Sequence, residues 1–346
     1  MASAEPAARR RACPARALQV AAVSDYHLVE AALDARWDAF VQASPHGSVY
    51  ALSPFLAALS VRPTLYYCVR DDVTEAAVLL THGSGGEPRS DHVVYDGIIG
   101  APRNGAANDG RAVLDAFGAT EFIAAELARR HAVVALQLSP AFVDIRPFLW
   151  LNHGVPGARY VADVRYTSYL DISRLAAEEK TVLKRARRSR RREIDDAREQ
   201  GIVTREEFDP PLCTTLYRKT MERQAIDAAE PDLEEMRRLM YALHDAGLGR
   251  MFVSWTHDGI PASAVFLGVD QKRAYGMFGG SDPGQRRGPA GTAVLWDAFR
   301  ALAASGVTQV DFDGVNSPRR GWFKLSFGGT LLPYYALTLH QQAAHG

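Results

Sequence analysis

The sequence predicts an α+β fold built from two units, each a mixed sheet flanked by helices. At 346 residues the chain exceeds what one hydrophobic core usually organises, which favours two domains. Both halves mix amphipathic helical patterns with consecutive strand-like runs, an order typical of helices layered on sheets. Hydrophobic residues make up 47% of the chain and charged residues 23%, so the composition is that of an ordinary globular protein with sizeable cores.

The N-terminal unit is expected to span residues 16–164, after a disordered tail at 1–15. The apolar run that follows the basic stretch of this tail is shorter than a signal peptide requires. Ser53 and Pro54 provide a helix cap followed by a proline at the first helical position. We predict strands at 18–23, 65–70, 76–81 and 132–138, and helices at 34–42, from 53 onward and at 113–130.

The C-terminal unit is expected to span residues 165–346. Residues 159–170 alternate as a strand does, and we place the boundary close to Val164. A long basic helix at 176–200 follows this strand. We then predict helices at 212–223, 232–246 and 290–305, and strands near 202 and at 249–256, 263–270, 273–278 and 309–313.

Charge and cysteine usage narrow the class of protein. Lys plus Arg and Asp plus Glu number 40 each, so the whole molecule has no field that attracts DNA or an anionic membrane. The three cysteines, Cys13, Cys68 and Cys213, are widely separated, which fits a reducing, cytoplasmic compartment. No apolar run approaches the length of a membrane span. Metal-ligand spacing is absent, and the scattered histidines do not accompany a nucleophile elbow.

A glycine-rich loop precedes the helix predicted at 290–305. Unpaired backbone N–H groups and the positive end of the helix dipole converge at a helix N-terminus, and glycine lets a pyrophosphate approach them closely. Pro289 lacks one such N–H group. The structural alternative is that the glycines and the proline only begin a core helix. The candidate donor-binding residues here are Gln285, Arg286, Arg287, Gly288, Ala290 and Gly291.

The strongest motif lies near the C-terminus, at residues 311–329. A strand ends in a carboxylate at Asp313, a turn rich in Gly and Asn follows, and then comes Phe-Lys-x-x-Phe-Gly-Gly from Phe323. This arrangement resembles the Fem-type (FemAB-like) amino-acid transferases of peptidoglycan synthesis and their GNAT-superfamily relatives. The loop Gln-x-x-Gly-x-Ala at 285–290 likewise resembles the coenzyme A pyrophosphate loop of GNAT acyltransferases. The resemblance implies two tandem GNAT-like domains.

The resemblance also implies roles for the Phe-Lys pair. Phe323 would line the acyl-donor channel, and Lys324 would polarise the acyl carbonyl, because an ammonium beside that carbonyl stabilises the developing oxyanion. The structural alternative is a surface lysine between two core phenylalanines, Phe323 and Phe327.

The basic helix supplies a second candidate phosphate-binding face, with Lys184, Arg188 and Arg191 at helical spacing. Such a face suits coenzyme A, a nucleotide diphosphate or tRNA. A solvated helix face explains the same charges.

The acceptor side is expected in the N-terminal unit. Tyr95 and Asp96 precede Gly97 in a segment that resembles the acceptor region of Fem-type proteins, where Asp96 would orient an amine. An Asx-turn carboxylate is the structural alternative. The resemblance adds Tyr217, Arg218 and Arg223 on a helix as further acceptor-binding residues. For the general base the sequence leaves Asp313, Asp96, Tyr334 and Tyr335 open.

Three hypotheses follow for function. The first is an N-acyltransferase that moves an acyl group from acyl-CoA to an amine of a small molecule, sugar or peptide by direct attack, with no tightly bound cofactor. The second takes aminoacyl-tRNA as donor and forms a peptide bond in a cell-wall precursor or secondary metabolite. The third is a non-catalytic binding module with the same fold, since fold alone does not ensure activity.

Overall fold

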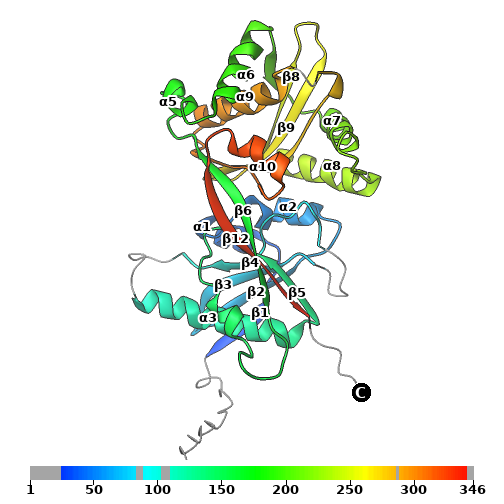
Figure 1. Cartoon of the computed structure of the whole chain (residues 1–346). Coiled ribbons are helices and arrows are strands. Elements are labelled where there is room, and N and C mark those ends of the chain that lie inside the picture. Colours follow the sequence, from blue (N-terminus) through cyan, green and yellow to red (C-terminus); the bar gives the residue numbers. More distant parts are fainter. Residues whose placement is uncertain (1–24, 83–88, 103–109, 286–287, 341–346) are drawn as a thin grey trace, which may run out of the picture.

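The computed structural model describes residues 25–82, 89–102, 110–285 and 288–340. These residues form two sheets flanked by helices, so the predicted α+β class is confirmed. In Figure 1 the smaller sheet lies below the upper part of the larger sheet, and two long strands of the larger sheet run down beside the smaller one. The strand predicted at 18–23 lies outside the described residues.

The smaller sheet is antiparallel throughout, in the order β1-β2-β3-β4. Its strands are β1 (Tyr26–Glu30), β2 (Thr64–Arg70), β3 (Val73–Leu80) and β4 (Gly97–Gly100). Helix α3 (Gly110–Arg130) covers one face of this sheet. Helices α1 (Ala35–Ala43) and α2 (Ser53–Ala58) lie on the other. The alternation of β2 explains both layers, because Tyr66 and Cys68 point to the α3 side while Leu65 and Tyr67 point to the α1 side.

The larger sheet has the order β5-β12-β6-β11-β10-β9-β8-β7, and its β10–β11 pair is parallel. Its strands are β5 (Val133–Gln137), β6 (Val161–Asp171), β7 (Val203–Glu206), β8 (Gly249–Trp255), β9 (Pro261–Val269), β10 (Arg273–Ser281), β11 (Gln309–Asp311) and β12 (Thr330–His340). The boundary that the sequence suggests near Val164 falls within β6, which pairs along its length with β12.

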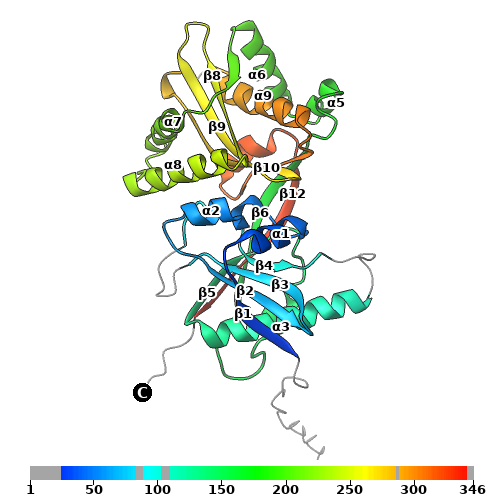
Figure 2. The ribbon, with the colours of Figure 1, turned by 180° about the vertical axis from the view of Figure 1, so that it is seen from behind.

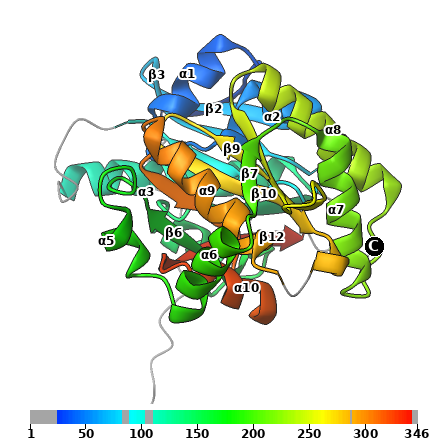
Figure 3. The ribbon, with the colours of Figure 1, turned by 90° about the horizontal axis from the view of Figure 1, so that it is seen from above.

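Helices cover both faces of the upper part of this sheet. They are α5 (Glu179–Leu183), α6 (Arg188–Glu199), α7 (Pro210–Glu222), α8 (Glu230–Asp245), α9 (Ala290–Ala304) and α10 (Pro318–Leu325), with the short α4 (Arg146–Trp150) beside α3. Seen from above in Figure 3, α7 and α8 lie on one side and α6 and α9 on the other. Along β8, Met251 and Val253 pack towards α8 while Phe252 packs towards α9.

The basic segment predicted as one helix at 176–200 is two helices, so that prediction is wrong. The chain leaves the helix after Leu183 and resumes at Arg188. Between them, the Arg187 amide donates a hydrogen bond of 2.9 Å to the carbonyl of Ser326. Gly328 closes the same contact, because a Cβ built there would lie 2.5 Å from the Arg185 carbonyl oxygen. The break therefore docks this segment against the end of α10.

One hydrophobic core joins the two halves. It contains Trp37 and Tyr50 from the N-terminal half together with Met236, Phe266 and Tyr334 from the C-terminal half. The Trp37 indole donates a 2.7 Å hydrogen bond to the Ala51 carbonyl, which fixes the segment that carries Tyr50. The candidate site described next lies against this shared core.

Candidate functional site

The site forms where two neighbouring strands separate. β10 and β11 pair only from Arg273 to Tyr275 against Gln309 to Asp311, and β10 then continues to Ser281 without β11. The β10–β9 register shifts between Gly276 and Phe278, which marks a bulge at this point. The chain that follows β11 turns sharply at Asp313, with φ 50°, and Gly314, with φ 66°. Irregular backbone and polar side chains therefore collect at the end of β11.

Asp311 lies at the centre of this region and has no exposed surface. Its carboxylate accepts hydrogen bonds from Tyr95 Oη at 2.9 Å, from the Asp313 amide at 3.0 Å and from Thr167 Oγ1. Burial raises the pKa of Asp311, and the hydrogen bonds from Thr167, the Asp313 amide and Tyr95 oppose that rise. Three donors on one carboxylate hold it in a fixed orientation.

Asp313 lies two residues further on, and its carboxylate is only partly satisfied. Tyr50 Oη donates a hydrogen bond to Oδ2, whereas Oδ1 is buried and has no hydrogen-bond partner. Burial raises the pKa of Asp313 well above its usual range, and the charge of Asp311 raises it further. A buried oxygen without a partner is costly, so it is a natural place for a substrate group to bind.

Lys324 closes the other side of the turn. Its ammonium donates hydrogen bonds to the backbone carbonyls of Phe312, of Asp313 at 2.8 Å and of Gly314 at 3.3 Å. An ammonium has three N–H donors, so a substrate carbonyl would have to displace one of these oxygens, and the longest bond, to Gly314, is the weakest. Lys324 therefore both holds the turn and brings a positive charge beside Asp313.

Aromatic rings from both halves enclose the two carboxylates. The Tyr50 ring packs edge-on against Tyr95 and Tyr275, with centroids 5.9 and 5.5 Å away, and Tyr95 packs against Tyr334 at 5.4 Å. Burial raises the pKa of Tyr50, Tyr95, Tyr275 and Tyr334. The phenols are therefore neutral hydrogen-bond donors near pH 7. The fourth general-base candidate, Tyr335, lies against the core beneath α3 instead.

The start of α9 borders a separate pocket of about 290 Å³. Gly288 and Ala290 line it, together with Gln200, Thr256, His257 and Asp258. Of the predicted donor loop, Arg286 and Arg287 lie outside the described residues, as does the Gln285 side chain. Gly291 packs inward, where a Cβ would lie 3.3 Å from Ser281 Oγ. The pocket has the size and polar rim for part of a nucleotide-like donor.

Arg190 connects this loop to the Phe-Lys pair. Its guanidinium lies over the Phe323 ring, 4.9 Å from the centroid, and donates hydrogen bonds of 2.6 Å to Thr292 Oγ1 and Glu193 Oε1. Thr292 belongs to the first turn of α9, and Phe323 precedes Lys324 on α10. Three segments far apart in sequence therefore meet at one arginine, which the sequence analysis did not single out.

The predicted basic face is divided by the helix break. Lys184 precedes the break, Arg188 begins α6, and both are exposed. Arg191 donates to the Lys184 carbonyl at 3.4 Å, a long contact. Arg187, within the break, lies over the Trp322 ring at 4.8 Å, and that ring is 64% exposed. The charges form an exposed surface with an aromatic ring rather than one helical face.

Asp96, predicted as an acceptor-binding residue, instead forms buried hydrogen bonds within the protein. Its buried carboxylate accepts hydrogen bonds from Thr81 Oγ1 at 2.6 Å, from the Gln137 amide at 2.5 Å and from Arg89 at 3.4 Å. The Asp96 amide donates to the Gln137 carbonyl at 2.7 Å. These contacts tie β4 to β5 and give the carboxylate no surface that a substrate amine could reach. Its neighbour Tyr95, in contrast, reaches the site through Asp311.

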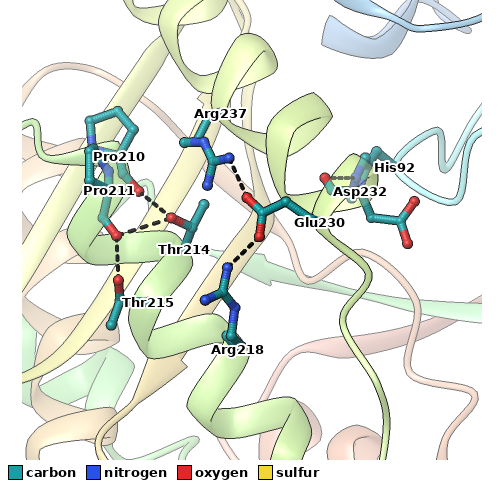
Figure 4. A network of polar contacts seen from close by, with 9 residues as sticks. All are labelled: His92, Pro210, Pro211, Thr214, Thr215, Arg218, Glu230, Asp232 and Arg237. Atoms are coloured by element: carbon teal, nitrogen blue, oxygen red, sulfur yellow. Dashed lines mark hydrogen bonds and ion pairs between the residues drawn. The ribbon is translucent and has the colours of Figure 1, made fainter.

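Of the three candidates on or beside α7, Arg218 lies in the network of Figure 4. Arg218 and Arg237 both donate to the Glu230 carboxylate, at 2.6 and 2.7 Å, on the exposed surface between α7 and α8. Tyr217 is half-buried against the shared core, and Arg223 is exposed at the end of α7. The structure therefore brings together Lys324, Asp313, Tyr95 and Phe323, while Asp96 and Arg218 are engaged elsewhere.

Within the described ranges no cluster of three or more His, Cys, Asp or Glu side chains has the geometry of a metal site. Over the same part of the chain, no helix combines the length and apolar character needed to cross a bilayer.

Comparison with known proteins defines the fold. Residues 184–319 match the model of the acetyltransferase (GNAT) domain. The chain as a whole is similar to the crystal structure of FemX, with a TM-score of 0.64 and 15% identity over 89% of this chain and 96% of that one. The chain thus has a GNAT fold, and the part of it that matches the GNAT domain model lies in its C-terminal half.

Two other solved structures share the architecture. A tandem GNAT protein from the clavulanic acid biosynthesis pathway matches with a TM-score of 0.51 and 11% identity, over 93% of this chain and 100% of that one. A conserved protein of unknown function from Bacteroides thetaiotaomicron matches at 0.53 and 13%, over 90% and 99%. A search of curated proteins found no significant match.

Proposed function

We propose that this protein is an N-acyltransferase that transfers an acyl group from acyl-CoA to the amine of a small-molecule, sugar or peptide acceptor. The observation that carries the proposal is the unpartnered Oδ1 of Asp313 beside the Lys324 ammonium, at the point where β10 and β11 separate. Direct attack of an amine on a thioester needs a positive charge near the carbonyl oxygen and a group that exchanges the amine proton. This site offers both.

Each step can be assigned to a residue of the chain. The start of α9, with Gly288 and Ala290, would hold the donor phosphates, because helix N-termini bind anions. Phe323 would line the acyl channel, and Lys324 would exchange its bond to the Gly314 carbonyl for one to the developing oxyanion. Asp313 Oδ1 would exchange the proton of the attacking amine.

The two halves of the chain would bind different substrates. Residues 16–164 would form the acceptor side and 165–346 the donor side, and the enzyme would act in the cytoplasm. Tyr50 and Tyr95, which reach from the N-terminal half to Asp313 and Asp311, support this arrangement because they couple the two halves at the reacting groups.

Thermal stability with acetyl-CoA and longer acyl-CoA tests the donor. A ligand that binds only the folded state raises the melting temperature with its concentration. We expect dose-dependent stabilisation that is lost in Gly288→Glu and kept in Ala304→Glu, which adds the same charge at the opposite end of α9. A thiol-release screen of amines with the stabilising ester then identifies the acceptor. Absence of both stabilisation and thiol release contradicts the acyl-CoA proposal.

A second donor, aminoacyl-tRNA, is favoured by one observation. The exposed Trp322 ring with Arg187 over it offers stacking and charge together, the combination that binds single-stranded nucleic acid ends. Fluorescence anisotropy with labelled tRNA at two salt concentrations tests this. Salt-sensitive binding that Trp322→Ala weakens would support aminoacyl-tRNA as the donor. Binding that this variant leaves unchanged would contradict a tRNA-binding role of Trp322.

A further inference from the structure

Asp311 and Asp313 differ sharply in how many donors they receive, although they are two residues apart. Asp311 accepts from Thr167, Tyr95 and the Asp313 amide, whereas Asp313 accepts only from Tyr50 and keeps Oδ1 unpartnered. Donors stabilise the ionised form of a carboxylate, so Asp311 is the better place for a negative charge. Two buried carboxylates this close do not ionise equally.

The surrounding charges favour one net negative charge on the pair. Lys324 faces Asp313 and Arg273 faces Asp311, but the Lys324 ammonium is shared among three carbonyls and the Arg273 guanidinium donates to Tyr169 Oη at 3.1 Å. Among the residues that the structure describes, the other titratable groups around the pair are Tyr50, Tyr95, Tyr169, Tyr275, Tyr334 and Asp270, with Arg165 near Tyr334.

We infer that Asp311 and Asp313 hold a single proton between them, so that Asp311 is the ionised member and Asp313 enters the reaction as a neutral acid. This inference deepens the proposed function and rests on it for its catalytic part. Asp313 would then be the catalytic residue, and Asp311, Tyr95 and Tyr50 would be positioning residues that determine where the proton lies.

The proton balance of acyl transfer closes with this assignment. The amine nitrogen forms the new C–N bond, and the C–S bond of the thioester breaks. Asp313 gives its proton to the departing thiolate and takes a proton from the amine nitrogen in return, so the pair again holds one proton at the end. No other proton donor or acceptor is required.

Carbon NMR of the full-length protein labelled at the aspartate carboxyl carbon tests the inference without substrate. We expect one resonance of a neutral carboxyl at pH 7, absent in Asp313→Asn and present in the control Asp282→Asn, which removes a carboxylate paired with Lys219. Asp311→Asn should lower the pH midpoint of the titration that this resonance reports by about 1 pH unit or more, because a like charge is lost. If every aspartate is ionised at pH 7, or if the neutral signal is lost only in Asp311→Asn, the inference is wrong.

Two conservative variants guard against misfolding of the carboxylate variants. Tyr50→Phe keeps the ring packing and removes a donor that lowers the pKa of Asp313, so the midpoint should rise. Tyr95→Phe removes a donor from Asp311 and should raise the midpoint of Asp311. A midpoint that moves in neither variant contradicts the positioning roles.

The failures of the two proposals are distinguishable. If Asp313 is neutral but no amine is acylated, the shared proton is supported and the proposed acyltransferase activity is contradicted. If acyl transfer occurs but no aspartate carboxyl is neutral, the shared proton is contradicted and the proposed activity is supported. If both are found, the transfer rate must fall as pH rises through the NMR midpoint, and a rate that ignores this midpoint overturns the catalytic role of Asp313.

Discussion

Removal of the Lys324 ammonium is expected to destabilise the fold as well as the reaction. Lys324→Met keeps the apolar stem and deletes the donors to the carbonyls of Phe312, Asp313 and Gly314. Each intramolecular hydrogen bond contributes about 1 kcal/mol net, and the left-handed conformation of Asp313 costs roughly 1–2 kcal/mol that these bonds help to offset. We therefore expect the free energy of unfolding to fall by about 2–4 kcal/mol.

Urea unfolding followed by tryptophan fluorescence measures this loss, with an unchanged m-value as the sign that the same surface is exposed. The control is Lys219→Met, which removes a half-exposed ion pair to Asp282 and should cost about 0–1 kcal/mol. A loss of unfolding free energy in Lys324→Met no larger than that in the control would show that Lys324 does not stabilise this turn. In the acyl-transfer assay, a role in polarising the carbonyl predicts a kcat lowered by about 100-fold or more at similar KM.

Three further variants test other parts of the structure. Gly328→Ala combines a positive φ of 89° with a Cβ 2.5 Å from the Arg185 carbonyl, so urea unfolding should show a loss of roughly 2–4 kcal/mol, against about 1 kcal/mol for Gly259→Ala, which has a similar φ and open space. Equal losses would contradict the proposed docking contact. Asp96→Ala should cost about 3–5 kcal/mol in the same assay because it removes the carboxylate partner of Arg89 and leaves the Gln137 amide without this acceptor; lost activity with unchanged stability would instead favour the acceptor role. Asp313 binds its proton more tightly folded than unfolded, so its contribution is complete below the unfolded pKa and is lost as pH rises towards the folded pKa, by up to about 1.4 kcal/mol per pH unit. Asp313→Asn should therefore become steadily more stable relative to the wild type from about pH 4 upward, and a difference in unfolding free energy independent of pH would exclude the raised pKa.

Local sequence patterns predict most of the strands and helices. Asp34 caps α1 because its carboxylate accepts hydrogen bonds from the amides of Arg36 and Trp37, a signal that lies entirely within four residues. The break between α5 and α6 could not be predicted in this way, because every residue from Glu179 to Glu199 suits a helix. The cause is the Ser326 carbonyl, about 140 residues away in sequence, which accepts a hydrogen bond from the Arg187 amide.

The residues of the candidate site also fall into those that local sequence patterns predict and those that only the fold brings together. The carboxylates at the end of β11 and the Phe-Lys pair are contiguous motifs, so the sequence points to Asp313, Phe323 and Lys324 directly. Tyr50 and Arg190 carry no local signal, since one is a core tyrosine and the other is one arginine among many. Their importance comes from what the fold places beside them, namely Asp313 and Phe323. Asp96 shows the reverse, because a polar motif at a strand end proves to be held by Thr81, Arg89 and the Gln137 amide.

The position of β12 between β5 and β6 has a consequence for biosynthesis. In the described sheet β5 pairs with β12 alone, and the two strands are separated by about 190 residues of sequence. At translation rates of about 5–20 residues per second, β5 waits roughly 10–40 s for its partner to emerge. The edge of β5 is therefore left without its partner strand while the rest of the chain is made, so the N-terminal half cannot complete its native contacts until the C-terminal strand has been synthesised.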